Sequence, residues 1–280
     1  MGRVISCFKE AYRLYSRHNI SRAAGALAYF FVLSVFPLLL CVNVLVGMAH
    51  VDIRLLLRSL DGFLPRQALA LVGEYVADVS ANGSPALLYA AVPAVILSGS
   101  AALRVLLDTM DELYHQPRDT GVRRIAVSVL FSVLFLATVY LSVLVIFTGD
   151  WFLRRLARVL SPQLTITVNL TALAGLWRWL RYLLLFCFVM LLVLALYRLG
   201  TPKQQVKRFP LLASALLCAL ALVVASVFFS WFIGFSSRYS LVYGSLASVI
   251  ILLLWLYLCA TVLLLGALFN CMWTKKDPKP

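Results

Sequence analysis

The sequence predicts an all-α integral membrane protein, a bundle of six transmembrane helices with an amphipathic helix in front of it and short amphipathic helices outside the membrane. Hydrophobic residues make up 63% of the 280 residues and charged residues 13%, whereas a soluble domain is about half apolar and a quarter charged. The apolar residues gather in charge-free runs long enough to cross a bilayer. These runs are continuous, whereas the strands of a transmembrane barrel alternate apolar and polar residues.

Residues 1–22 are expected to form a cytoplasmic helix that lies on the membrane surface. Ile5, Phe8, Tyr12 and Tyr15 recur at steps of three and four, so they share one face of a helix, and the basic residues point elsewhere. An amphipathic helix of this kind is typical of membrane interfaces. Binding to a partner protein is the alternative use of the same face.

The membrane domain is expected to cover residues 23–273. The six spans are expected at about 24–48, 83–104, 125–148, 177–199, 210–234 and 241–273, followed by a cytoplasmic tail at 274–280. The outer loop 52–83 is predicted to contain two short amphipathic helices. We interpret residues 150–181 as an amphipathic or re-entrant element outside the membrane, because Pro162, Gln163 and Asn169 do not suit a seventh span.

Basic residues predict the orientation and the kind of partner. In a soluble protein a net charge of +14 would indicate nucleic acid. In a membrane protein, basic residues at span ends set the orientation and meet anionic lipid. We therefore expect membrane lipids, and no nucleic acid, as partners. With the N-terminus inside, the cytoplasmic segments carry sixteen Lys and Arg residues and the outer segments nine, which predicts two cytoplasmic termini.

Two spans carry proline together with serine, and these residues are candidates for a substrate pathway. In the first span Pro37 cannot donate to the preceding turn, Ser34 lies beside it, and Asn43 follows along the helix. Pro93 and Ser98 repeat this arrangement in the second span. Broken helices with polar side chains are typical of transporters. Ordinary helix packing is the alternative, because Gly and Pro are frequent in membrane helices.

The last span adds Tyr243, Gly244 and Asn270 to the pathway hypothesis. Small residues are candidates for close helix packing, because they let two backbones approach each other. The candidate packing residues are Ala24, Gly25 and Ala28 in the first span and Gly244 and Ser248 in the last.

The sequence predicts no enzyme, no cofactor and no metal site. Asp108, Glu112 and His115 share one face of a helix, which would suit metal ligation. Two i, i+4 pairs, Arg104 with Asp108 and Asp111 with His115, explain these residues better. The sequence also lacks the phosphate-binding loop and the hydrolase and metalloprotease motifs.

Three stretches of the chain resemble the YihY/BrkB family (virulence factor BrkB) of bacterial inner-membrane proteins. The stretches are AGALAYFFVLSVFPLLL, LDTMDELYHQ with a following Arg, and YGSLASVIILLLWLYLCATVLLLGALFN. The matching positions are Ala28, Tyr29, Ser34, Pro37, Tyr243, Gly244, Leu254, Trp255, Tyr257, Gly266, Ala267 and Asn270. The resemblance implies six spans, cytoplasmic ends, an inner-membrane location, and a link to serum resistance and, in some members, to export. It also implies that the former family name, ribonuclease BN, is a mislabel.

The chain departs from the pattern that the resemblance implies at Leu268. The family usually has an acid between the positions of Ala267 and Asn270, and this chain has leucine there. If that acid couples an ion in relatives, this chain lacks it. The connection YRLGTPKQ also departs from the Tyr-Arg-x-Leu-Pro-Asn form that the resemblance implies, and of that form Tyr197, Arg198 and Pro202 remain.

We therefore expect a transporter or exporter of a small solute or a lipid-like substrate in the cell envelope. The alternative is a non-catalytic scaffold that binds a protein partner in an envelope complex.

Overall fold

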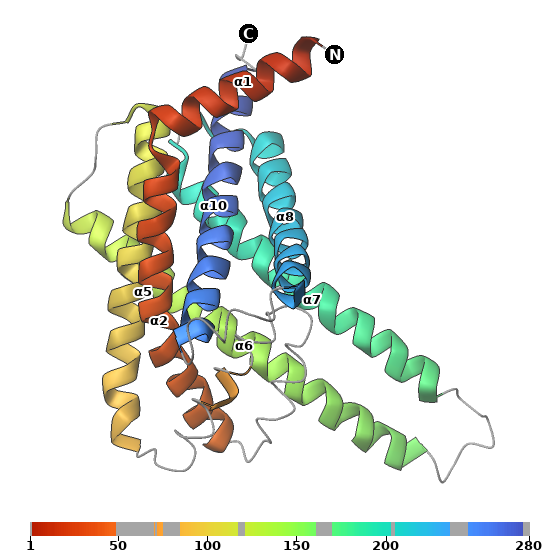
Figure 1. Cartoon of the computed structure of the whole chain (residues 1–280). Helices are drawn as coiled ribbons and strands as arrows, with labels where there is room; N and C mark the ends of the chain where they lie inside the picture. The colour runs from red at the N-terminus through yellow and green to blue at the C-terminus, as the bar shows by residue number, and fades with distance from the viewer. Residues whose placement is uncertain are drawn as a thin grey trace.

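The chain folds into seven long helices over the residues that the structure describes. The computed structural model describes residues 2–48, 70, 72–74, 85–116, 121–160, 170–202, 205–235 and 246–276 (Figure 1). The helices are α1 (Gly2–Arg17), α2 (Ile20–Met48), α5 (Pro85–Tyr114), α6 (Val122–Leu160), α7 (Leu170–Gly200), α8 (Arg208–Phe235) and α10 (Leu246–Lys276). The predicted all-α fold is confirmed.

Six of these helices are long and apolar enough to cross a membrane, which confirms the predicted number of spans. The apolar parts are Ile20–Cys41, Tyr89–Tyr114, Val122–Ser142, Leu183–Gly200, Arg208–Phe232 and Leu246–Thr274. Figure 1 shows both termini at the same end of the bundle, which we call the termini end. The helix α1 lies across this end, and α10 runs between α2 and α8.

The helix α1 packs on the bundle with a different stripe from the predicted one. Ala11, Leu14 and Tyr15 pack against the main core, whereas Tyr12 is 71% exposed. Of the predicted apolar face, Tyr15 therefore contacts the bundle and Tyr12 does not. The helix α1 crosses α10 and α2, and only the side chains on the side of α1 that faces these two helices pack against the core. A turn at Asn19, which has a φ of 47°, separates α1 from α2. Asn adopts this left-handed conformation more readily than most residues.

The predicted outer element at 150–181 is continuous with two of the spanning helices where the structure describes it. The helix α6 extends to Leu160 and α7 begins at Leu170. Both helices lean away from the other helices toward the end opposite the termini (Figure 1). These helical parts therefore do not form an element separate from the spans, because each continues a span in an unbroken helix. The two short helices predicted in the outer loop lie largely outside the described residues.

The main core lies near the termini end, and all six spanning helices contribute buried residues to it. Tyr197 of α7 is completely buried there, and its hydroxyl donates a hydrogen bond of 2.7 Å to the carbonyl of Leu263. Gly266 of α10 lies directly beneath this hydroxyl. A Cβ at Gly266 would overlap the Tyr197 hydroxyl and would lie 2.9 Å from the Cβ of Cys218. The close approach of α7, α8 and α10 therefore requires glycine at this position.

The predicted packing role of Gly25 is wrong. A Cβ added at Gly25 would have no neighbouring atom within 4 Å. The neighbouring Ala24 and Ala28 are both buried, as expected. They belong to a stripe that continues to Leu27 and Phe31 at helical spacing and faces the other helices. Gly25 lies outside this stripe. Ser248 is half-buried at the start of α10.

Candidate functional site

The two predicted serines meet between α2 and α5. The Ser34 hydroxyl lies 3.0 Å from the Ser98 hydroxyl. Each serine is also within hydrogen-bonding distance of its own helix, Ser34 of the Phe30 carbonyl at 2.7 Å and Ser98 of the Ala94 carbonyl at 2.6 Å. The sequence pattern thus identified two polar side chains that are neighbours across the bundle.

The two prolines lie inside helices that continue past them. Pro37 is half-buried in α2, and Pro93 is exposed on α5. In Figure 1 the second half of α2 changes direction relative to its first half, as is typical of a helix that contains proline. Asn43 belongs to α2, but its side chain lies outside the described residues, as do Tyr243 and Gly244.

A cavity of about 320 Å³ lies beside the serine pair, enclosed by residues of five helices. Its lining comes from α2, α5, α6, α7 and α10, and it includes Ser34. The described lining residues carry no charge, and most of them are Leu, Val or Phe. The volume falls within the range of small-molecule pockets, which are mostly apolar with a few placed polar groups. This cavity is the candidate functional site.

Two residues that line the cavity hold buried polar atoms without a hydrogen-bond partner. Ser132 of α6 is 2% exposed, and its hydroxyl has no hydrogen-bond partner among the residues that the structure describes. The indole nitrogen of Trp255 on α10 is also buried without one. Sequence reasoning did not select Ser132, because a serine in a membrane helix usually bonds to its own backbone. Only the three-dimensional packing reveals that this one does not.

Buried side chains fill the bundle between the cavity and the termini end. Along α5, Leu106 lines the cavity, Met110 lies completely buried in the core, and Tyr114 ends the helix, at steps of four residues. Along α10, Leu263 lines the cavity and the completely buried Leu264 follows it. We call Met110, Tyr197, Leu264 and Gly266 the closing layer.

Asn270 lies beyond the closing layer and does not line the cavity. It is 1% exposed, and its amide donates hydrogen bonds to the hydroxyls of Tyr114 at 2.9 Å and Thr201 at 3.0 Å. Thr201 in turn donates to the carbonyl of Tyr197 at 2.7 Å. This polar cluster joins the ends of α5 and α10 to the segment after α7. Asn270, which the sequence analysis placed in the substrate pathway, is therefore part of a hydrogen-bonded cluster that connects α5, α7 and α10.

Two salt bridges from one arginine join α5 to α6 at the termini end. The guanidinium of Arg124 donates to Asp108 and to Asp111, each at 2.7 Å. Arg104, the predicted partner of Asp108, donates from Nε to the carbonyl of Ser100 at 3.3 Å. The sequence did not identify Arg124 as the bridging residue, because its distance along the chain from the aspartates exceeds the local helical spacing.

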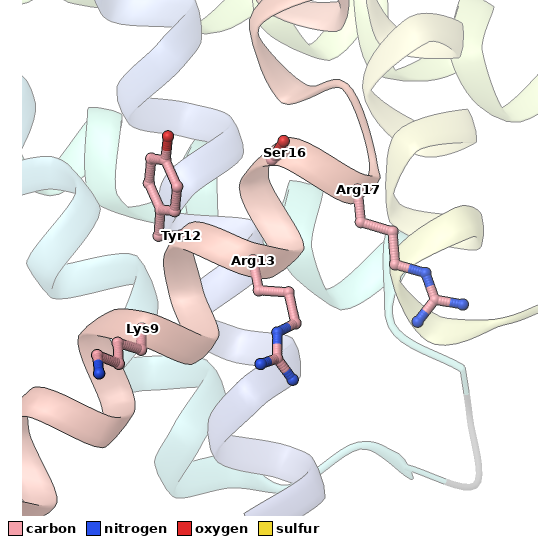
Figure 2. Close-up of a pocket in the computed structure, with 5 residues that line it drawn as sticks. All are labelled: Lys9, Tyr12, Arg13, Ser16 and Arg17. Atoms are coloured by element: carbon pink, nitrogen blue, oxygen red, sulfur yellow. The ribbon is translucent and has the colours of Figure 1, made fainter.

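A second hollow lies on the outer surface of α1. It is lined by Lys9, Tyr12, Arg13, Ser16 and Arg17. Figure 2 shows the side chains of Arg13 and Arg17 extending to one side of the helix and that of Tyr12 to the other. Lys9, Arg13 and Arg17 follow each other at steps of four residues, and we call them the α1 cation row.

Comparisons with known proteins connect this architecture to one family. The family model described as Virulence factor BrkB matches residues 11–279. A Bacillus subtilis (strain 168) protein named "Putative ribonuclease-like protein YfkH" is 23% identical over 99% of this chain and 98% of its own length. The UPF0761 membrane protein azo3165 of Azoarcus sp. (strain BH72) is 27% identical over 91% of this chain. The UPF0761 membrane protein PM1616 of Pasteurella multocida (strain Pm70) is 25% identical over 74%.

The chain matches 60% of the length of each of the two UPF0761 proteins. No solved structure matches the chain. The family match covers all six apolar helices together with the candidate cavity. The chain is an integral membrane protein that belongs to the BrkB family.

Proposed function

We propose that this protein transports or exports a small solute or lipid-like molecule across the membrane through the cavity between its helices. The observation that carries the proposal is the position of the cavity, enclosed by five spanning helices and next to the serine pair. A molecule in this cavity would be inside the membrane and in contact with every spanning helix except α8.

The arrangement of the helices supports a cavity with access from one end at a time. The closing layer and the Asn270 cluster fill the bundle toward the termini end. At the other end α6 and α7 lean away from the other helices (Figure 1). Transport would require the closing layer to separate, and this is a motion of packed helices of the kind that transporters use in alternating access.

The prolines inside α2 and α5 give each helix a position at which it can bend. A proline leaves one backbone carbonyl without its intrahelical donor, so the helix is easier to bend there. Pro37 lies within one turn of Ser34, and Pro93 lies five residues before Ser98. Ser98 donates its proton to the Ala94 carbonyl, so the hydroxyl pair joins the two helices when Ser34 donates its single proton to the Ser98 oxygen in place of the Phe30 carbonyl.

Filling the cavity tests the transport proposal. Ala102 lines the cavity and is almost completely buried, so Ala102→Phe would occupy part of the space. Ala221 on α8 is exposed, and Ala221→Phe is the matched control. A deletion strain complemented with wild type or with either variant is compared by mass spectrometry of the apolar molecules released to the outside. We expect wild type and the control to restore release and Ala102→Phe to fail at an equal membrane level.

Full restoration by Ala102→Phe would contradict the proposal. A double replacement of Ser34 and Pro37 by alanine then distinguishes the role of the cavity from the role of the proline-containing part of α2. Loss of release in that variant alone would assign the transport role to the motion of α2, not to the space that Ala102 lines.

We propose further that both termini are cytoplasmic and that the membrane is the bacterial inner membrane. The excess of Lys and Arg in the segments at the termini end supports this orientation. Fusions of green fluorescent protein and of alkaline phosphatase to the C-terminus test it. Fluorescence without phosphatase activity is expected, and the opposite pattern would reverse the orientation.

The same orientation places α1 at the cytoplasmic leaflet, where anionic lipid headgroups lie. The α1 cation row lines a hollow on its surface, and Tyr12 is exposed beside it. Tyr is frequent at the membrane interface, and Lys and Arg are attracted to anionic lipid there. We propose that α1 rests on this leaflet.

A further inference from the structure

We infer that the cavity binds an uncharged molecule with an apolar body and a hydrogen-bond acceptor oxygen, and that the Ser132 hydroxyl is the group that recognises this oxygen. An ester or a ketone of medium chain length has this chemistry. The inference deepens the proposed function, because it names the substrate class of the same cavity. A binding experiment tests this inference, so its result does not depend on whether the protein transports the ligand.

The lining excludes a charged ligand. No Lys, Arg, Asp, Glu or His is among the described residues that line the cavity. A charge moved into such surroundings loses its hydration and gains no partner. The part of the ligand that enters must therefore be neutral.

Ser132 differs from the other serines of this region. Ser128, one turn earlier on α6, donates to the Ile125 carbonyl at 2.9 Å. The hydroxyls of Ser34 and Ser98 likewise bond to carbonyls of their own helices. Ser132 is 2% exposed and lines the cavity, yet its hydroxyl has no partner. A buried hydroxyl without a partner is unfavourable, and an acceptor oxygen of a ligand would satisfy it.

Two other residues that line the cavity support the same ligand chemistry. Gly99 of α5 lines the cavity next to Ser132, and a Cβ at Gly99 would lie 3.0 Å from the Ser132 hydroxyl oxygen. Glycine therefore keeps the space beside the hydroxyl open. Trp255 lines the same cavity, and its indole nitrogen, which can only donate, is also buried without a partner. Two unpaired donors in one apolar cavity favour a ligand with acceptor oxygen.

The volume sets the length of the part that enters. A space of about 320 Å³ holds about ten groups of the size of a water molecule, each of which occupies about 30 Å³ in the liquid. A chain of eight to ten carbon atoms with one oxygen group is therefore a suitable probe, estimated as about ten such groups.

The test uses the full-length protein in lipid nanodiscs and methyl decanoate that carries a diazirine. After illumination, labelled peptides are identified by mass spectrometry. Unlabelled methyl decanoate, decane and decanoate are then added as competitors. For each one, the concentration that displaces the probe is expressed as its concentration in the bilayer. We expect labels on residues that line the cavity. The ester should displace the probe at a concentration at least three-fold lower than decane or the decanoate anion, as one hydrogen bond of about 1 kcal/mol predicts.

Ser132→Ala should remove this preference of ester over decane, a loss of about three- to ten-fold for one hydrogen bond. Ser128→Ala is the matched control, because that hydroxyl already bonds to its own helix, and it should leave the preference unchanged. Labels outside the cavity, or an equal loss of ester and decane binding in Ser132→Ala, would overturn the inference.

The outcomes also separate binding from transport. If the ester preference depends on Ser132 but the cavity-filled Ala102→Phe protein still restores release, the binding inference stands and the transport proposal fails. If Ala102→Phe blocks release but ester and decane compete equally, the transport proposal stands and the inference about acceptor oxygen is overturned.

Discussion

Replacing Gly266 by alanine tests how tightly the closing layer is packed. The new methyl group would overlap the hydroxyl of Tyr197 and lie 2.9 Å from the Cβ of Cys218. Tyr197 is completely buried and cannot swing into solvent. The methyl group must therefore push the ring away and break its hydrogen bond to the Leu263 carbonyl, or separate α7 and α8 from α10.

The expected cost follows from these two contacts. Overpacking a dense core costs about 1–3 kcal/mol, and a hydrogen bond inside a membrane protein is worth about 0.6 kcal/mol on average and about 1.7 at most. Gly266→Ala should therefore lower the free energy of unfolding by about 2–4 kcal/mol, the approximate sum of these terms. Gly25→Ala is the matched control, because a methyl group there meets no atom within 4 Å. It should change stability by less than about 1 kcal/mol, in the stabilising direction.

The assay is unfolding in mixed micelles with increasing sodium dodecyl sulfate, followed by circular dichroism. A double-mutant cycle with Tyr197→Phe isolates the clash, because phenylalanine lacks the hydroxyl that the methyl group would meet. In the Tyr197→Phe protein, Gly266→Ala should cost at least about 1 kcal/mol less than in wild type, the usual range for groups in contact. An equal cost in both backgrounds, or an equal effect of Gly25→Ala and Gly266→Ala, would refute this reasoning.

Three other changes have defined outcomes. Asn270→Leu keeps the volume but removes two buried donated hydrogen bonds, so it should destabilise the protein in the same assay by about 1–3 kcal/mol; unchanged stability would contradict this role. Arg124→Gln leaves two partly buried α5 aspartates without their cation and should cost about 1–3 kcal/mol, whereas the exposed neighbour Arg123→Gln should cost almost nothing. Replacing the α1 cation row by glutamine should remove the extra thermal stability that phosphatidylglycerol nanodiscs give over phosphatidylcholine ones, about 1 kcal/mol per cation; a persisting difference would contradict the proposed contact.

Sequence reasoning selected Ser34 and Ser98 individually by their chemistry, and their depth in the bundle explains why they meet. Polar residues inside apolar runs are rare, so each one could be read from the sequence. Ser34 lies 14 residues after the start of α2, and Ser98 lies 16 residues before the end of α5. Because the two helices run in opposite directions, these positions fall at a similar depth from the termini end, at 1.5 Å per residue. Adjacent helices then bring them together.

The cavity and its unpaired groups could not be predicted in this way. Ser128 and Ser132 have the same chemistry and lie on the same helix, and only the packing of α5 and α6 leaves the second hydroxyl without a partner. Likewise, Gly25 and Gly266 both read as small residues in a span. Which of them faces another helix depends on the rotation of α2 and α10 about their axes, and hydropathy does not fix this rotation.

Four of the positions that resemble the BrkB family fall into two groups in space, and this division bears on the mechanism. Ser34 and Trp255 line the cavity. Gly266 and Asn270, together with Tyr197, form or support the packing between the cavity and the termini end. A closely packed interior tolerates few combinations of side chains, because even a small change in side-chain volume strains the neighbouring residues. The last part of the end motif is therefore explained by the packing that closes the bundle, whereas Trp255 of the same motif lines the cavity. Ser132, the proposed ligand-binding residue, lies outside the three motifs.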